Sequence, residues 1–238
     1  MDLAGKSVVV TGAAVGIGRA LALRLGVEGC SVVVADVDEV EGRRTADLIG
    51  GSAVFVPVDV RSEQDLRAMA ATAVERHGRL DVLVNNAGGG GHVPPHFPDA
   101  PHEEWGATLD LNLRSAMRAT QLALGPMRRG GGGVVVNVAS TAGLGADRYQ
   151  SPEYAAAKAG LIRFTTALRV VHPGVRVNCV VPDWIATERA VAELAAMSAA
   201  ERAAAPIPVP MDDVADAVIE LVVDDTAAGR AVVLRGGV

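Results

Sequence analysis

Tyr154 and Lys158 have the residue types and the spacing for proton transfer. They are four positions apart at the start of a predicted helix, so they share one face, with their Cβ atoms about 5–6 Å apart. A nearby ammonium stabilises phenolate, and we expect Lys158 to lower the pKa of Tyr154 from its reference value of about 10. Such a pair can exchange a proton with an alcohol or a carbonyl group. The same spacing is common on ordinary helix surfaces, so the interpretation depends on the surrounding residues.

A glycine-rich turn follows the first predicted strand, where residues 11–18 read TGAAVGIG. Gly12, Gly16 and Gly18 allow the backbone to turn sharply and to approach a pyrophosphate. The N-terminus of the following helix offers unpaired N–H groups and a partial positive charge to the same group. The position of this turn between a strand and a helix predicts a dinucleotide site.

Asp36 ends the second predicted strand, about 20 residues beyond the glycine-rich turn. A carboxylate at this point can accept hydrogen bonds from both ribose hydroxyls of an adenosine, and it would repel a 2′-phosphate. No basic residue lies beside it, because Arg43 and Arg44 come later, on the solvated face of a predicted helix. The residue therefore favours NAD over NADP. The alternative is that Asp36 only caps the next helix.

These residues need a scaffold that gathers distant segments, and the hydrophobic pattern predicts one. Seven short Val-rich runs are nearly continuous in apolar residues, which is typical of strands buried on both faces of a parallel sheet. The runs occupy residues 7–10, 31–35, 53–57, 82–84, 134–138, 176–181 and 231–234. Helical spacing is found at residues 17–28, 62–77, 104–129, 152–171 and 212–223. The alternation predicts an α/β fold, a doubly wound, Rossmann-type parallel sheet with helices on both faces.

Three segments interrupt this alternation, at residues 88–101, 130–133 and 183–210. The first is rich in Gly, His and Pro and is expected to be a loop beside a cleft, and the second is a helix stop. The third combines an Ala-rich helical patch with a Pro-x-Pro-x-Pro run, and we expect a mobile lid that contacts substrate. We expect one domain over residues 1–238, since the length suits a single core.

Composition restricts the possible partners. Half of the 238 residues are apolar and the formal net charge is −6, so no broad basic field attracts nucleic acid or an anionic membrane. No apolar run approaches the roughly 20 residues of a membrane span, and no export signal is visible. Two cysteines are too few for a disulfide framework or a four-ligand metal site. We expect a cytoplasmic protein that binds small molecules or further copies of itself.

Several motifs together resemble the short-chain dehydrogenase/reductase family over nearly the whole chain. They are TGxxxGxG at residues 11–18, Asp59-Val60, Asn85-Asn86-Ala87-Gly88, Asn112, Ser140 and Tyr154-x-x-x-Lys158. The resemblance implies an oxidoreductase in which a nicotinamide cofactor carries the hydride. It also implies a homotetramer or homodimer built through the helices at residues 104–129 and 152–171.

The resemblance implies a role for each matching residue. Ser140 would bond the substrate oxygen, Tyr154 would transfer its proton, Lys158 would bind the nicotinamide ribose, and Asn112 would hold a water that links Lys158 to solvent. The residues that would border the cofactor are Gly12, Gly16, Ile17, Gly18, Asp36, Asp59, Val60, Asn86, Ala87, Gly88, Ile185 and Thr187.

The sequence departs from the family pattern at four places. The interval from Ser140 to Tyr154 is one residue longer than usual, over residues 147–150, and it brings in Tyr149 as a rival phenol. We prefer Tyr154, because Glu153, four residues beyond Tyr149, would raise the pKa of that phenol. Asp183 replaces a common Gly and would contact a polar substrate group or cap a turn.

The other two departures concern the end of the chain and a group of histidines. The sequence ends one residue after a Gly-Gly turn, so we do not expect a tail that closes a neighbouring subunit's site. His92, His96 and His102 lack metal-ligand spacing, so we expect no metal and a solvated or pocket-lining role instead.

Three functions fit these residues. The first is NAD-dependent interconversion of a secondary alcohol and a ketone, with Tyr154 as general acid and base. The second is reduction of a 3-oxo thioester or quinone-like carbonyl at the same site, which Asp36 disfavours because biosynthetic reduction more often uses NADP. The third is a non-catalytic NAD-binding sensor or scaffold, which would have no need of Asn112, Ser140, Tyr154 and Lys158 together. The substrate is left open.

Overall fold

The seven Val-rich runs form the strands of a single sheet in the computed structural model, which describes residues 1–91, 93–145, 149–169 and 173–237. β-Branched side chains pack well on a pleated surface, and most of these side chains are fully buried. Every strand begins and ends within one residue of its predicted bounds. The strands are β1 (Ser7–Thr11), β2 (Ser31–Asp36), β3 (Val54–Pro57), β4 (Val82–Asn85), β5 (Gly133–Val138), β6 (Val175–Pro182) and β7 (Ala231–Leu234).

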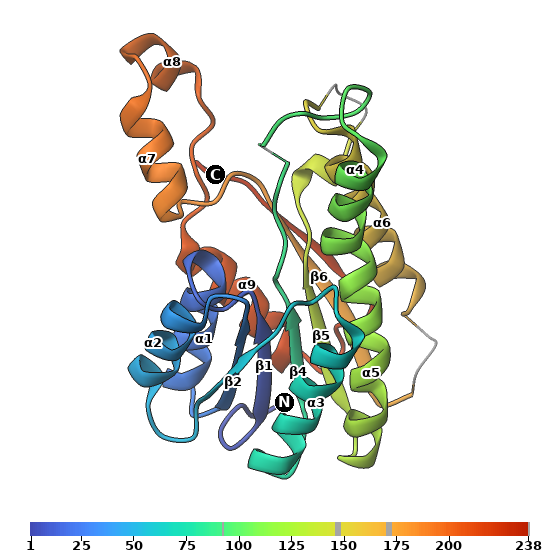
Figure 1. Cartoon of the computed structure of the whole chain (residues 1–238). Helices are drawn as coiled ribbons and strands as arrows, with labels where there is room; N and C mark the ends of the chain where they lie inside the picture. Colours follow the sequence, from blue (N-terminus) through green and yellow to red (C-terminus); the bar gives the residue numbers. More distant parts are fainter. Residues whose placement is uncertain (92, 146–148, 170–172, 238) are drawn as a thin grey trace.

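The strand order confirms the doubly wound fold. The sheet runs β3-β2-β1-β4-β5-β6-β7, and all neighbouring strands are parallel (Figure 1). The chain therefore winds outward in one direction from β1 and in the other from β4. In such sheets ligands bind outside the carboxyl ends of the strands, near the pair where the order reverses. That pair is β1 and β4, which carry the glycine-rich turn and the Asn85-Asn86 sequence at their ends.

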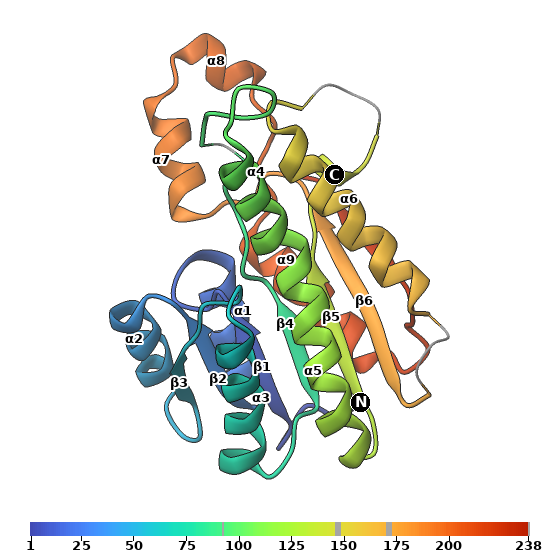
Figure 2. The same cartoon turned by 45° about the vertical axis from the view of Figure 1, so that its right-hand side comes forward.

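Helices cover both faces of the sheet (Figure 2). Alternate strand residues point to opposite sides, so Val8 and Val10 pack in one core while Val9 packs in the other. The first face is covered by α1 (Gly16–Val27), α2 (Glu39–Ile49) and α9 (Met211–Val223). The second is covered by α3 (Glu63–His77), α5 (Ser115–Arg129) and α6 (Pro152–Ala167).

The predicted helix over residues 104–129 is present but is not uniform. It consists of α4 (His102–Leu109), a π-helical segment (Asp110–Arg114) and α5. A π turn widens the helix by one residue per turn and is often found at functional sites. It contains Asn112, the only fully buried residue of that segment. The predicted helix at residues 152–171 ends at Ala167 in the structure, and residues 170–171 lie outside the described part of the chain.

The segment at residues 183–210 contains two helices, α7 (Glu188–Ala196) and α8 (Ala199–Ala204). Both project beyond the carboxyl edge of the sheet (Figures 1 and 2). Their base is tied by a parallel bridge between Ile185 and Val209. We call residues 183–210 the α7–α8 arm. Across the described ranges, no helix has both the length and the apolar character needed to cross a bilayer.

Candidate active site

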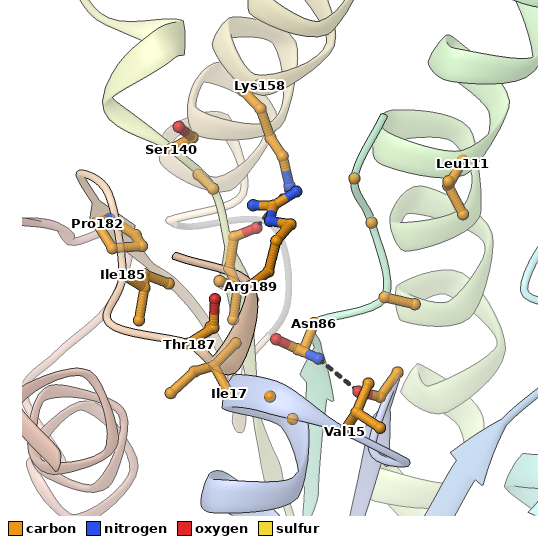
Figure 3. A pocket seen from close by; sticks show the side chains of 18 of the residues that line it. Val15, Ile17, Asn86, Leu111, Ser140, Lys158, Pro182, Ile185, Thr187 and Arg189 are labelled. Atoms are coloured by element: carbon orange, nitrogen blue, oxygen red, sulfur yellow. Dashed lines mark hydrogen bonds between the residues drawn. The ribbon is translucent and has the colours of Figure 1, made fainter. Parts of the chain in front are cut away.

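A cavity of about 1040 Å³ lies at the carboxyl ends of the strands and extends from the glycine-rich turn to the α7–α8 arm. We call it the strand-end cavity. Figure 3 shows side chains from α6, from the end of β5 and from the arm directed into it. Every cofactor and catalytic residue predicted from the sequence lines this cavity, with the exception of Asn112. The fold thus brings residues from position 12 to position 187 to one place.

The glycine-rich turn is shaped by close backbone contacts. A Cβ on Gly18 would lie 1.9 Å from the carbonyl oxygen of Gly12, and one on Gly12 would lie 2.8 Å from Cα of Ala87. The Asn86 side chain donates hydrogen bonds to the carbonyl oxygens of Thr11 and Gly12, at 2.9 and 3.0 Å (Figure 3). Gly12 and Gly18 therefore have no room for a side chain, and Gly16 has a positive φ of 55° that favours glycine.

The N-terminus of α1 faces the cavity without a side-chain cap. Val15 precedes the helix and supplies no side-chain cap, and the first turn contains no acidic residue. The first N–H groups of a helix need acceptors and carry a partial positive charge. This end of α1 is therefore suited to a pyrophosphate.

Asp36 is held toward the glycine-rich turn. Its carboxylate accepts hydrogen bonds from the backbone N–H groups of Ala14 and Asp38, at 2.8 and 3.0 Å. The alternative role as a helix cap is wrong, because Asp38 caps α2 by accepting from the N–H of Glu41. Arg43 and Arg44 are exposed as expected and pair with Glu39 and Glu41.

The Asp59 side of the cavity contains a cation that the sequence reasoning did not single out. Arg61 donates to both carboxylate oxygens of Asp59, at 2.9 and 2.8 Å, and this bond lowers the pKa of Asp59. Arg61 lines the cavity next to Val60. Arg61 could have been found in the sequence, because it comes two residues after Asp59 and shortly after the end of β3 at Pro57.

The residues that the sequence predicts to transfer protons meet at the other end of the cavity. Ser140 and Tyr154 both line this end of the cavity, and Lys158 Nζ lies 5.5 Å from the centre of the Tyr154 ring. Lys158 is buried and donates to the carbonyl oxygen of Val138 at 2.9 Å. The helix start at Pro152 and the end of β5 together place these three side chains.

The pKa of Tyr154 is raised, whereas the spacing to Lys158 predicted a lowered value. Burial raises the pKa of Tyr154 to about 12, the neighbouring Tyr149 adds to this rise, and Ser140 opposes it. Burial also lowers the pKa of Lys158 to about 8, because a charged ammonium is poorly solvated there. Loss of solvation is the largest cause of both shifts, and residue spacing does not reveal it.

Asn112 lies behind the cavity wall. Its side-chain oxygen accepts from the N–H of Gly89 at 2.9 Å, and its nitrogen donates to the carbonyl oxygens of Gly89 and Thr108. A Cβ on Gly88 would lie 2.7 Å from Oδ1 of Asn112 and 3.3 Å from Nζ of Lys158. Asn112 and Lys158 therefore meet at Gly88. A water between them stays a prediction.

Tyr149 lies beside Tyr154 in the cavity. The two rings are stacked with centres 6.1 Å apart. Burial raises the pKa of Tyr149, Arg189 opposes this and Asp183 adds to it. The expectation that Glu153 would raise this pKa is wrong, because the Glu153 carboxylate is bonded to His96 at 2.9 Å.

Residues of the α7–α8 arm complete the cavity. Asp183 accepts a hydrogen bond from the Thr141 hydroxyl at 3.0 Å, so it ties the arm to the residue after Ser140. Trp184 and Arg189 also line the cavity. The sequence predicted substrate contact for residues 183–210 as a whole but did not point to either of these two residues. Arg189 points from α7 toward the catalytic end (Figure 3).

The histidines near the site have other partners. His96 contacts Glu153, and the ring of His102 packs edge-on against Trp105 with centres 4.8 Å apart. His92 lies outside the described residues. Among the residues that the structure describes, no three His, Cys, Asp or Glu side chains are grouped to hold a metal ion.

Comparisons with known proteins agree with this site. Residues 6–197 match the family described as short chain dehydrogenase. The chain is 43% identical over 220 residues to (5R,7aS)-5-hydroxy-7a-methyl-1-oxo-2,3,5,6,7,7a-hexahydro-1H-indene-carboxyl-CoA reductase of Mycobacterium tuberculosis, covering 86% of this chain and 83% of that protein. It is 36% identical over 194 residues to 7alpha-hydroxysteroid dehydrogenase of Escherichia coli K12, covering 79% and 74%.

A comparison with solved structures points to the same family. The structure of a 7alpha-hydroxysteroid dehydrogenase complexed with NADH and 7-oxo glycochenodeoxycholic acid matches with a TM-score of 0.88 and 29% identity, covering 99% of this chain and 94% of that one. The chain therefore belongs to the short-chain dehydrogenase/reductase family and is an oxidoreductase.

Proposed function

We propose that this chain interconverts a secondary alcohol and a ketone, with NAD as the hydride carrier and Tyr154 as the general acid and base. The observation that carries the proposal is that Ser140 and Tyr154 lie with buried Lys158 in one cavity with the glycine-rich turn, Lys158 Nζ being 5.5 Å from the centre of the Tyr154 ring. A non-catalytic sensor would require none of this proton-transfer group.

The chain's residues fit a dinucleotide at the first end of the strand-end cavity. The uncapped start of α1 suits the pyrophosphate, and the close contacts at Gly12 and Gly18 leave the backbone exposed to it. Asp36 offers a carboxylate for the adenine ribose, which supports NAD over NADP. Ile185 and Thr187 lie where they could hold the nicotinamide amide. When bound, NAD supplies the hydride acceptor.

The catalytic end supplies the proton chemistry. For ketone reduction, Ser140 and Tyr154 donate hydrogen bonds to the carbonyl oxygen, and the Tyr154 proton moves to that oxygen as negative charge develops. In the reverse direction, Tyr154 as phenolate removes the alcohol proton. The Lys158 ammonium stabilises negative charge at this end, and Asn112 fixes the backbone at Gly89, beside Lys158.

The relatives support this reaction class and leave a second candidate. The 7alpha-hydroxysteroid dehydrogenase acts, by its name, on a secondary alcohol of a ring system. The match to a carboxyl-CoA reductase favours, as a second candidate, reduction of a carbonyl on a thioester-bearing substrate. Both reactions use the same Tyr154 proton.

Removal of the Tyr154 hydroxyl by the substitution Tyr154→Phe tests the proposal. A panel of secondary alcohols with NAD, and of ketones with NADH, is screened by NADH absorbance. Tyr154→Phe is expected to abolish turnover while NADH binding, measured by fluorescence, persists. Tyr149→Phe is the matched control and is expected to retain turnover. Undiminished activity in Tyr154→Phe would refute the proposal, and tight NADH binding without turnover in the unmodified protein would favour a sensor.

We further propose that the chain is a single domain whose α7–α8 arm closes over the substrate as a lid. We also propose that the protein is cytoplasmic and forms a homodimer or homotetramer. Helices α4, α5 and α6 would build the interface, and Met117 of α5, 41% exposed, supports an apolar contact there. A monomeric mass in light scattering would contradict the assembly.

A further inference from the structure

The segment that joins β4 to α4 has contacts that the proposed reaction does not use. Its residues 93–101 lie beside the start of α6, where Glu153 is buried and 8% exposed. The Glu153 carboxylate lies 2.9 Å from Nδ1 of His96 and accepts from the N–H of Phe97 at 3.3 Å. It also accepts from the Ser151 hydroxyl at 2.9 Å. One buried carboxylate thus joins this segment to the helix that carries Tyr154.

The other end of the same segment lies directly against the catalytic ring. A Cβ on Gly91 would be 2.7 Å from Cγ and 2.8 Å from Cδ1 of Tyr154, so the Gly91 backbone is in contact with the ring. The Gln150 side chain donates to the Gly91 carbonyl oxygen at 3.3 Å. Gly89, two residues earlier, is bonded to Asn112 through both its N–H and its carbonyl.

The contact between Gly91 and the Tyr154 ring limits where the ring can lie. Gly91 contacts the ring at its attachment point, where small displacements alter the direction of the phenol. A shift of about 1 Å at a catalytic group can reduce a rate about 100-fold. Catalytic side chains are therefore held by packing and by hydrogen-bonded neighbours.

Glu153 is directed away from the chemistry. It does not line the strand-end cavity, although it immediately precedes Tyr154 in the chain. Burial of a carboxylate is unfavourable unless hydrogen bonds compensate for it. The bonds from its own N–H, His96, Ser151 and Phe97 do so, and the pKa of Glu153 is lowered although burial acts to raise it.

We propose that Glu153, through His96 and Phe97, is a positioning residue that holds Gly91 against the ring of Tyr154 and thereby fixes the direction of the phenol. The role rests on the proposed function of Tyr154 in proton transfer. A merely structural role at the start of α6 would affect stability and leave the turnover of folded protein unchanged.

The kinetic test compares Glu153→Ala, Glu153→Gln and His96→Ala at a temperature where each variant is folded by circular dichroism. We expect kcat to fall about 10- to 100-fold in Glu153→Ala, with KM and the NADH dissociation constant within about twofold, because an interaction with the transition state is weakened. Glu153→Gln keeps the size and one acceptor and should recover most of the rate. The double variant Glu153→Ala/His96→Ala should be no slower than Glu153→Ala, since both act through one contact.

Asp212→Ala is the matched control, because Asp212 is an exposed acid in the first turn of α9 and is remote from the proposed contact. It should lower the melting temperature without lowering kcat. Unchanged kcat in Glu153→Ala, or a loss confined to KM, would overturn the proposal.

A second measurement does not depend on the substrate. The chain has two tyrosines, so the Tyr149→Phe background leaves Tyr154 as the single site for fluorotyrosine. Its ¹⁹F resonance should move toward the unfolded position in Glu153→Ala and stay in place in Asp212→Ala. If the unmodified protein turns over no substrate but this shift is seen, positioning holds and the proposed function fails. If the resonance does not move, positioning fails whatever the activity.

Discussion

Neutralising Asp36 should change the affinities for NAD and NADP in opposite directions. Asp36→Asn keeps the size of the side chain and removes its charge. The carboxylate accepts from the N–H groups of Ala14 and Asp38 and borders the cavity, so it has lone pairs left for the ribose hydroxyls. An amide has one oxygen acceptor in place of two, and its NH₂ group would face a donor.

The expected size follows from these bonds. A hydrogen bond to a charged group contributes about 1.5–3 kcal/mol, and about 1.4 kcal/mol is a factor of ten in affinity. Loss of one such bond to the ribose should weaken NAD binding about 10- to 100-fold. A 2′-phosphate at this place is repelled by the carboxylate, by about 4 kcal/mol for unit charges 4 Å apart near a protein surface. Asp36→Asn should therefore strengthen NADP binding at least about tenfold.

Isothermal titration with NADH and NADPH measures both affinities without a substrate. Asp38→Asn is the control, because Asp38 is exposed, caps α2 and lies two residues away. It should leave the ratio of the two dissociation constants unchanged. An equal fall in both affinities for Asp36→Asn would mean that Asp36 only shapes the glycine-rich turn, and the reasoning would be refuted.

Three further outcomes can be checked. Burial raises the pKa of Tyr154 to about 12, so the phenolate form is scarce at neutral pH and its fraction grows as pH rises. The rate of alcohol oxidation should therefore rise between about pH 6 and pH 8, while the rate of ketone reduction stays constant. An oxidation rate that falls over this range would contradict the prediction. Gly18→Ala, whose Cβ would lie 1.9 Å from a backbone oxygen, should weaken NADH binding at least about 100-fold, and titration giving unchanged affinity would contradict the geometry. Asn137→Ala removes the buried partner of Asn85 and Thr165, and it should lower the free energy of unfolding by about 2–4 kcal/mol in denaturant titrations; a change below about 0.5 kcal/mol would show that water replaces the amide.

The strands, their ends and the family motifs could be predicted from the sequence. Continuous Val-rich runs indicate parallel strands because the signal is local, and the structure moves no strand end by more than one residue. The glycine spacing reflects close backbone contacts at residues 12 and 18 and a positive φ at residue 16, all of which are properties of one local turn. The Tyr154–Lys158 interval has the same local character.

Partners across the fold could not be predicted, because they depend on which segments meet. Glu153 is near Tyr149 in the sequence but is bonded to His96 of another segment, and Asp38 rather than Asp36 caps α2. Asn112, in the π-helical segment between α4 and α5, is likewise bonded to Gly89 of another segment.

The sequence by itself predicted which residues would transfer protons and which turn would hold a dinucleotide, since each prediction rests on spacing within one segment. The tertiary structure decided the electrostatics of those residues. Tyr154 and Lys158 are four positions apart in any helix, yet the direction of both pKa shifts follows from how much water the packed segments exclude. Solvation is a property of the whole fold, and no single segment contains it.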